Sequence, residues 1–438
     1  MDRDRLPAPV ARAVAWRWFP HAVVLALSVA LRVAWVVWVD RDGFVLNDAM
    51  MYNANAVAIN EGLGFRPPQG GPSAQWPPAY SAILAGIYWA FGVNPFLGEL
   101  FNALVGAVTV VMLMLLIERM VDGRNGRRAA VVGGVMFAVL PGPILWTDVL
   151  VTETLYTGLF VLFLLVLSAA KPTWPWLVAT GAVIGIGGLV RGEALTWGLL
   201  PIVLFWRDLP RLELVKRIVG VAVVAMVVLA PWTIRNAIVM DAFVPVATNA
   251  SATLWSGHHE GATGAQTYPP ESYYQQFDQE APLRELESGR ALRNDAIRYM
   301  LTHPIRELEL IPLKLIHLNR GDSYALDWVN DAPDVAPISA IDVERIGVLS
   351  DIGYFGLLVL FVLGAFVLGR QFWSTRMGRV FSASLLTALF LYGFLYYGNY
   401  RYRLAYEPLM VVVAAVFLVR LWDWRREEAA RAGNVNLR

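Results

Sequence analysis

The chain has 438 residues, of which 57% are hydrophobic and 16% are charged, and its formal net charge at pH 7 is +1. So few charges exclude an ordinary soluble domain, in which about a quarter of the residues are charged, and nothing in the charge pattern supports nucleic-acid binding. The chain contains no cysteine, which excludes disulfides, thiolate chemistry and Cys-ligated metals.

Long apolar runs predict an all-α polytopic membrane protein, because an apolar helix of about 20 residues crosses a bilayer. Tryptophans such as Trp38, Trp146 and Trp206 lie at the ends of these runs, as in an aromatic belt. We place about ten spans near residues 20–39, 97–118, 129–147, 153–170, 175–190, 194–206, 218–235, 351–369, 380–398 and 404–422. The apolar segment 79–91 is too short to span, and we expect an interfacial helix there.

The basic residues orient these spans by the positive-inside rule. Arginines and lysines precede the first span, follow the second, separate the sixth from the seventh and the eighth from the ninth, and occur again in the tail. All of these segments lie on one side of the membrane if there are ten spans and the N-terminus is cytoplasmic. We therefore expect a multi-pass protein of the cell (inner) membrane with both termini in the cytoplasm.

This topology divides the chain into four parts. We expect an N-terminal transmembrane module at 1–239 with a first outer loop at 40–96, an extracytoplasmic region at 240–350, C-terminal transmembrane helices at 351–424 and a cytoplasmic tail at 425–438. The extracytoplasmic region is too long to be a simple connection, and we expect it to be mostly helical.

The first outer loop carries the clearest candidate for chemistry. If 47–60 is a helix, Asp48, Tyr52 and Asn55 share one of its faces. A carboxylate at this position could act as a general base toward an acceptor hydroxyl. Asp is also a good helix N-cap, and the spacing alone leaves this structural alternative open.

A second candidate lies at the outer ends of spans nine and ten. Arg401 and Arg403 flank Tyr402 on the non-cytoplasmic side, against the positive-inside trend. Guanidinium groups bind phosphate oxygens in a bidentate manner, so an anionic lipid headgroup is a natural ligand, although simple snorkelling to the interface remains an alternative. Glu407 lies just inside a span and needs a partner, for which Arg403 at i−4 is the best placed.

Further charges lie within or at the ends of the spans. They are Arg32, Glu153, Arg191, Glu193 and Arg235. Intramembrane charges are costly and often mark a functional cavity. We expect Glu153 and Arg191 on the same side as Asp48, while each of them alone could be a structural ion-pair partner. The adjacent pair His258–His259 is a weak metal candidate, and neither a phosphate-binding loop nor a dinucleotide fingerprint occurs.

The order of several motifs resembles the polytopic glycosyltransferases of the GT-C class, and within it the bacterial branch of the protein O-mannosyltransferases and the lipid A aminoarabinose transferase. The motifs are Asp48 to Phe65, Trp76-Pro77-Pro78-Ala79-Tyr80, Thr152-Glu153-Thr154-Leu155-Tyr156, Pro231-Trp232-Thr233-Ile234-Arg235-Asn236 with Phe243-Val244-Pro245 and Thr248-Asn249, and Arg401-Tyr402-Arg403-Leu404 with Glu407-Pro408. Each motif is unspecific alone, but their common order covers most of the chain.

The resemblance implies a cell-envelope enzyme that moves a sugar from a polyprenyl-phosphate donor to an acceptor hydroxyl with inversion. It implies Asp48 as the general base, Arg401 and Arg403 as the first candidates for the donor phosphate, and Arg191 and Arg235 as the next. The substrate cavity would include Asn47, Tyr52, Asn55, Glu153, Tyr402 and Glu407. No cofactor is predicted. Many relatives carry two adjacent acids where this chain has Asn47 and Asp48, which weakens the case for a divalent metal.

Two other functions remain open on the sequence. A lipid or solute transporter could line its pathway with the same charges, although no repeated halves are visible. A non-catalytic protein of envelope assembly could share the fold. The sequence identifies neither the sugar nor the acceptor, which could be protein, lipid or polysaccharide.

Overall fold

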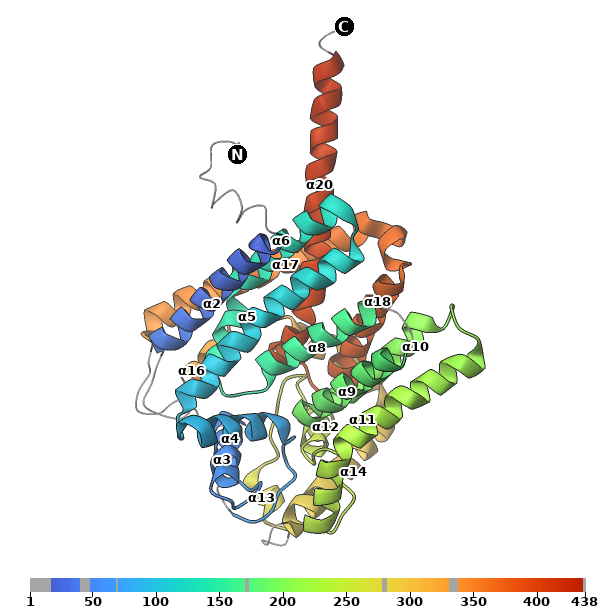
Figure 1. The fold of residues 1–438 in the computed structure, drawn as a ribbon. Helices are drawn as coiled ribbons and strands as arrows, with labels where there is room; N and C mark the ends of the chain where they lie inside the picture. The colour runs from blue at the N-terminus through green and yellow to red at the C-terminus, as the bar shows by residue number, and fades with distance from the viewer. Residues whose placement is uncertain are drawn as a thin grey trace.

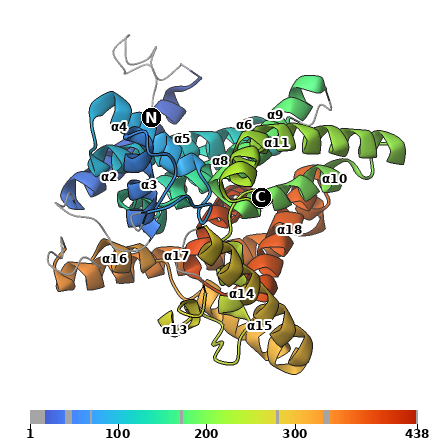
Figure 2. The same ribbon diagram turned by 90° about the horizontal axis from the view of Figure 1, so that it is seen from below.

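The computed structural model describes residues 17–39, 48–67, 70–169, 173–277, 282–330 and 338–435, and every regular element in these ranges is a helix. The predicted all-α class is therefore confirmed. Long helices form a bundle from which α20 projects at one end, while the short helices α3, α4 and α13 lie at the other end (Figure 1). Figure 2 shows the bundle from that second end.

The N-terminal half begins with a long helix, continues through the first outer loop, and returns to the bundle. Its helices are α2 (Phe19–Val39), α3 (Asp48–Asn60), α4 (Ala79–Phe91), α5 (Pro95–Met120), α6 (Gly123–Val139), α7 (Pro141–Leu145), the 3-10 helix η2 (Trp146–Asp148), α8 (Glu153–Ser168), α9 (Trp174–Val190), the 3-10 helix η3 (Gly192–Leu199), α10 (Leu200–Phe205) and α11 (Arg211–Val239).

The C-terminal half contains residues 240–350, which we call the outer region after their expected position, and the last long helices. Its helices are α12 (Ala250–Gly257), α13 (Glu271–Tyr274), α14 (Leu283–Thr302), α15 (Pro304–Leu318), α16 (Tyr324–Val329), α17 (Ala340–Trp373), α18 (Arg376–Leu389), the π-helix η4 (Phe390–Leu395), α19 (Tyr400–Arg403), the 3-10 helix η5 (Leu404–Tyr406) and α20 (Glu407–Val435).

Each of the ten expected spans coincides with a helix or a helix pair, but not all of these are long enough to cross a membrane alone. In the described ranges, five are long and apolar enough: Phe19–Val39, Pro95–Met120, Ala340–Trp373, Arg376–Leu395 and Tyr400–Ala429. A sixth is the bent pair Gly123–Val139 and Pro141–Asp148, while α8, α9 and the segment Gly192–Phe205 are apolar but short. The protein is thus polytopic, and the count of ten stays a prediction.

The span expected at 129–147 is a broken helix. Its two parts meet at an angle of 58°, and the break lies at Leu140, whose backbone is extended (φ −63°, ψ 122°) in front of Pro141. A residue that precedes proline avoids the helical conformation, because the proline ring clashes with its backbone and Cβ. Periodicity did not indicate this bend, since both halves are apolar.

The first part of helix α20, residues 407–419, is buried in the bundle between α6 and α17. Glycines allow the close approach: a Cβ on Gly133 of α6 would lie 3.2 Å from the Cβ of Ala415, and one on Gly364 of α17 would lie 3.0 Å from the Cβ of Phe417. Small residues at such contacts let membrane helices pack closely in the absence of a hydrophobic driving force.

The first outer loop and the outer region pack against each other. The Glu285 carboxylate of α14 accepts hydrogen bonds from the Ser73 hydroxyl (2.8 Å), the Ala74 N–H (3.2 Å) and the Thr248 hydroxyl (2.7 Å). The Thr248 N–H donates to the Ala74 carbonyl at 3.0 Å. These bonds hold the end of the first loop beside the start of the outer region.

Candidate active site

Four charged side chains from distant parts of the chain form a continuous ion-pair row. Asp48 Oδ2 lies 2.9 Å from Arg401 Nη2, and Arg401 Nε bonds to Glu153 Oε1. The same Glu153 oxygen lies 2.6 Å from Arg191 Nη1. The expectation that Glu153 and Arg191 lie on the same side as Asp48 is therefore confirmed by direct contact.

Helix ends position these four groups. Asp48 and Glu153 are the first residues of α3 and α8, where the partial positive charge of the helix N-terminus favours a carboxylate. Arg191 follows the last residue of α9. Arg401 lies in the short helix α19, which the Asn399 side chain caps by accepting a hydrogen bond from the Arg401 N–H at 2.9 Å.

Aromatic rings enclose the two guanidinium groups. Arg401 lies 4.6 Å from the Trp328 ring centroid, and Arg191 lies 5.2 Å from that of Tyr402 and 5.5 Å from that of Tyr156. Tyr402 in turn stacks on Tyr392 at 4.7 Å. Cation–π contacts of this kind stabilise a charge that has lost its water.

The row is buried at one end and open at the other. The side chains of Glu153 and Arg401 are 1% and 9% exposed, whereas that of Asp48 is 34% exposed. Between Glu153, Arg191, Arg401 and Tyr402 there is a cavity of about 10 Å³, room for one water, and Glu153 Oε2 has no hydrogen-bond partner among the described residues. A ligand can therefore reach the row from the Asp48 side.

The predicted neighbours of Asp48 on α3 lie close to the row. Tyr52 is buried, and burial together with the Asp48 carboxylate raises the pKa of its hydroxyl, so this phenol stays protonated. Asn55 is fully buried, and neither its amide nitrogen nor its oxygen has a hydrogen-bond partner in the described ranges. Asn47 lies outside the described residues.

The structure does not bring Arg403 and Glu407 into this row. Arg403 Nη2 lies 3.1 Å from Glu407 and 2.9 Å from Asp322, and its guanidinium also donates to the Leu318 and Gly321 carbonyls at 3.1 and 2.9 Å. The predicted Arg403–Glu407 pair is confirmed. With these bonds made, Arg403 joins α20 to the end of α15.

Arg235 lies neither in the charged row nor beside Arg403. Its guanidinium donates to the carbonyls of Phe65 (2.9 Å) and Ser73 (2.7 Å) and lies 4.8 Å from the Trp232 ring centroid. Arg32, another of the predicted membrane charges, is buried against the Ser28 hydroxyl and the Ala138 carbonyl. Both arginines therefore hold backbone segments together and do not contact Asp48.

The sequence did not indicate several residues of the site. Trp146 and Trp328 flank Arg401, and Thr152 lies 3.4 Å from Arg191. Trp328 comes from the outer region, and no local pattern marks it. Thr152 belongs to the motif Thr152-Glu153-Thr154-Leu155-Tyr156, and this motif was the one signal in the sequence that could have indicated it.

The fold is that of a polytopic membrane protein with a carboxylate–arginine site at one end of its helix bundle, and a match to a family model confirms the predicted resemblance to the GT-C class. Residues 75–234 match the family model of dolichyl-phosphate-mannose-protein mannosyltransferase. This stretch is less than half of the chain; it includes Glu153 and Arg191 but neither Asp48 nor Arg401. Among curated proteins, no sequence matches the chain.

Solved structures of an archaeal enzyme share this fold. The oligosaccharyltransferase of Archaeoglobus fulgidus in its apo form is 14% identical with a TM-score of 0.55, and the match covers 96% of this chain and 52% of that one. The oligosaccharyltransferase AglB of the same organism, with an inhibitory peptide and a dolichol-phosphate, is 15% identical with a TM-score of 0.50, over 94% and 52% of the two chains. ArnT of Cupriavidus metallidurans with undecaprenyl phosphate is 14% identical with a TM-score of 0.44, over 91% and 77%. The chain thus spans about half the length of the archaeal enzyme.

Proposed function

We propose that this chain is a membrane glycosyltransferase that moves a sugar from a polyprenyl-phosphate donor to an acceptor hydroxyl at the outer face of the membrane. One observation carries the proposal: a partly exposed carboxylate, Asp48, lies 2.9 Å from Arg401, whose guanidinium and that of Arg191 share Glu153. A base and a cationic pair next to each other are what this transfer requires. The match of 75–234 to the mannosyltransferase family supports it.

In the proposed reaction the acceptor oxygen attacks the anomeric carbon while its proton passes to the Asp48 carboxylate. The new bond joins the acceptor oxygen to the sugar, and the bond between the anomeric carbon and the phosphate oxygen breaks. The electron pair of that bond stays on the departing polyprenyl phosphate. Because attack and departure occur on opposite sides of the carbon, the configuration inverts.

The phosphate gains charge as it departs, and cationic groups aimed at that position lower the barrier. We assign this role to Arg401 and Arg191, whose guanidinium groups are held by Glu153 on one side and aromatic rings on the other. The donor phosphate would take the Arg401 Nη2 position now bonded to Asp48, which would free Asp48 to face the acceptor. Tyr52, Asn55 and Tyr402 would complete the cavity wall.

We propose a lipid-linked donor because Arg401 lies at the start of the apolar span Tyr400–Ala429, where a lipid phosphate could reach it. The dolichol-phosphate bound to the archaeal enzyme belongs to that protein, and we propose the same class of lipid phosphate here. We assign Arg403, Glu407 and Arg235 a supporting role, because the two arginines donate their hydrogen bonds to the chain itself.

We also propose ten spans, cytoplasmic termini, and a site on the extracytoplasmic side of the cell membrane.

We propose that the outer region helps to select the acceptor. The Gly398 N–H donates to the Gly264 carbonyl at 2.8 Å, and the Asn399 amide reaches Gln266 Oε1 at 3.4 Å. The outer region thereby touches the cap of the helix that carries Arg401. A transfer assay with a mixed acceptor source identifies whether the acceptor is a protein, a lipid or a polysaccharide.

The test compares Asp48→Asn with Glu61→Gln, which changes an exposed acid directly after the same helix. Purified protein in liposomes receives radiolabelled polyprenyl-phosphate hexoses and pentoses together with an envelope extract as the acceptor source. We expect transfer by wild type and Glu61→Gln, and a loss of about 100-fold or more in Asp48→Asn. Full transfer by a folded Asp48→Asn variant would contradict the base assignment. A wild type that transfers no sugar but moves the lipid or a solute across the bilayer would favour the transporter.

A further inference from the structure

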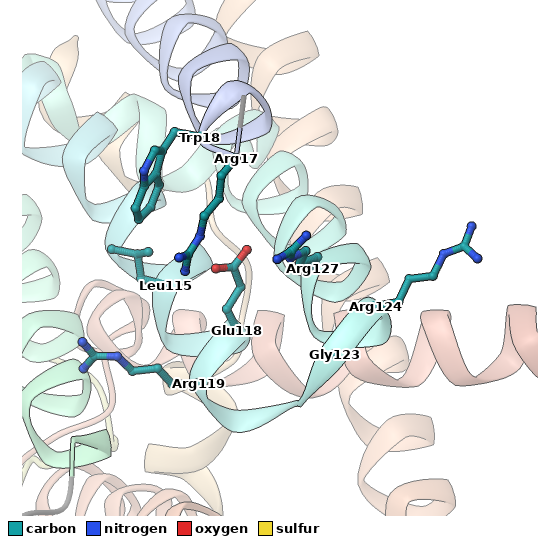
Figure 3. A pocket seen from close by; sticks show the side chains of 8 residues that line it. All are labelled: Arg17, Trp18, Leu115, Glu118, Arg119, Gly123, Arg124 and Arg127. Carbon is teal, nitrogen blue, oxygen red and sulfur yellow. The ribbon is translucent and has the colours of Figure 1, made fainter. Parts of the chain in front are cut away.

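A basic cavity lies between the start of α2, the end of α5 and the start of α6 (Figure 3). This is the end of the bundle opposite α3, whose first residue is Asp48 (Figure 1). Its volume is about 620 Å³, and its lining comprises Arg17, Trp18, Leu115, Glu118, Arg119, Gly123, Arg124 and Arg127. Four arginines against one glutamate leave a local charge of +3. None of these residues takes part in the proposed transfer.

The position of the cavity points to the headgroup layer of the membrane. Helices α2 and α5 are long and apolar enough to span, and the bent pair that begins at Gly123 can span as well. The cavity lies where all three begin or end. Trp18 is 37% exposed at its rim, as a tryptophan of the interfacial belt would be.

Only some of the cavity arginines form hydrogen bonds or ion pairs with other described residues. Arg119 donates to the Leu165 carbonyl (2.9 Å) and contacts the Ser168 hydroxyl (3.4 Å), so its guanidinium is held. In the described part of the chain, no carboxylate pairs with Arg17, Arg124 or Arg127 within ion-pair distance. Unpaired arginines around one space attract an anion, and arginine suits phosphate in particular.

Figure 3 shows how the charged side chains of the cavity are arranged. The side chains of Arg17, Glu118 and Arg127 point toward the same part of the cavity, while those of Arg119 and Arg124 point away from it. Glu118 also lies 3.6 Å from His21 Nε2. Its carboxylate therefore marks a position at which the protein already accommodates one negative charge between two arginines.

We propose that this cavity binds the phosphodiester headgroup of an anionic phospholipid from the adjoining leaflet, with Arg17 and Arg127 contacting the phosphate. The volume lies in the range of roughly 300–1,000 Å³ typical of sites for organic ligands, more than a bare phosphate ion requires. Leu115 and Trp18 add the apolar surface that the glycerol backbone and first acyl carbons would contact. Basic pockets between membrane helices bind anionic headgroups in this way.

The test measures bound lipid, so its result does not depend on transfer activity. Delipidated full-length protein in detergent is mixed with equal amounts of phosphatidylglycerol and phosphatidylcholine, and native mass spectrometry counts each bound lipid. We expect wild type to prefer phosphatidylglycerol. In the Arg17→Gln/Arg127→Gln variant we expect the ratio of bound phosphatidylglycerol to bound phosphatidylcholine to fall. Each lost arginine should lower it about fivefold, since one arginine near the surface contributes about 1 kcal/mol.

The matched control is Arg207→Gln/Arg211→Gln. Arg207 stacks on its neighbour Trp206 at 4.8 Å, as Arg17 stacks on Trp18 at 5.1 Å, but neither Arg207 nor Arg211 lines the cavity. We expect this variant to keep the wild-type preference within about twofold. An equal loss in both double variants would show only general surface attraction and overturn the site.

The variant Glu118→Gln distinguishes loss of the site from loss of folding, because we expect it to increase the preference for phosphatidylglycerol. Removal of the competing carboxylate raises phosphatidylglycerol binding about fivefold, and a damaged protein would not gain affinity. An unchanged preference in both Glu118→Gln and the Arg17/Arg127 variant overturns the proposal. Displacement of the lipid by inorganic phosphate at an equal concentration would also overturn it, since the site would then take the free anion.

Discussion

Arg401 and Arg403 lie two residues apart in α19 and have opposite surroundings, because residues at i and i+2 of a helix point to different sides. Arg401 pairs with Asp48 and Glu153 next to the open end of the charged row. Arg403 pairs with Asp322 and Glu407 inside the protein. Arg401 is therefore placed to contact a ligand, whereas Arg403 is placed to stabilise the fold.

Replacement of each arginine by lysine should separate these roles. Arg401→Lys keeps the charge but loses the planar fork that suits phosphate, and we expect a loss of sugar transfer of about 100-fold or more. It also loses one of the contacts to Asp48 and Glu153, so we expect a destabilisation of about 1–2 kcal/mol. Arg403→Lys loses at least two of its polar contacts, and we expect roughly 2 kcal/mol of destabilisation. Transfer assays and thermal unfolding of the two purified variants measure both effects. A loss of transfer in Arg403→Lys as large as that in Arg401→Lys would contradict the division.

The sequence predicted part of the site for identifiable reasons. Arg403 and Glu407 follow the i, i+4 rule, and their contact needs only a helix. The contact between Glu153 and Arg401 joins residues 248 positions apart, and no helical periodicity specifies which helix ends meet. The sequence therefore placed Glu153, Arg191 and Asp48 on one side of the membrane but could not separate Arg401 from Arg403.

At the scale of elements, the short helix α7 is fitted closely to the loop before α16. A Cβ on Gly142 would overlap the carboxylate of Asp322, and Asp322 is the partner of Arg403. Glycine is thus required where α7 approaches this buried carboxylate. The bend at Pro141 brings α7 to this place. The hydrophobic pattern of 129–147 does not show the bend, and the sign of it in the sequence is Pro141 itself.

Gly142→Ala should disturb this contact. The added methyl group forces α7 and the Asp322 loop apart, and we expect a destabilisation of about 1–3 kcal/mol, as for other overpacked sites. The control is Gly86→Ala in α4, where a Cβ meets no atom within 4 Å, and there we expect stabilisation of up to about 1 kcal/mol. Denaturation of both variants in detergent measures the difference. A Gly142→Ala variant as stable as wild type would contradict the close fit.

At the scale of the whole molecule, a buried polar network joins the outer region to the end of the ninth expected span. His258 Nδ1 lies 2.7 Å from Glu307 Oε2, and its Nε2 lies 2.9 Å from the Leu395 carbonyl. Lys314 Nζ lies 3.3 Å from His258 and 3.0 Å from the Phe394 carbonyl. Burial lowers the pKa of Lys314 to about 8.

This network predicts a loss of stability in mild acid. Burial and the Lys314 ammonium lower the pKa of His258, while Glu307 acts in the opposite direction. Below about pH 6.5 the unfolded chain therefore binds a proton that the folded chain resists, and stability falls with pH through that window. We expect the unfolding midpoint of wild type to fall by roughly 2–4 °C more than that of His258→Gln between about pH 7 and pH 5.

The control for this pH effect is His303→Gln, because His303 is exposed directly after α14. Its midpoint should follow that of wild type at every pH. Burial and Glu407 raise the pKa of Asp322, which acts in the opposite direction on acidification, but this contribution is common to all three proteins. Parallel curves for wild type and His258→Gln would show that His258 does not set the acid response.

The orientation of the molecule can be tested directly, because the chain has no cysteine and any introduced thiol is the only one. Ser272 in α13 and Glu428 in α20 are both exposed, and Figure 1 places these two helices at opposite ends of the bundle. The positive-inside pattern predicts that a membrane-impermeant maleimide labels Ser272→Cys in intact spheroplasts, whereas Glu428→Cys reacts only after permeabilisation. Labelling in the reverse order would place the Asp48 row on the cytoplasmic side, where the donor and acceptor would have to be different from those proposed.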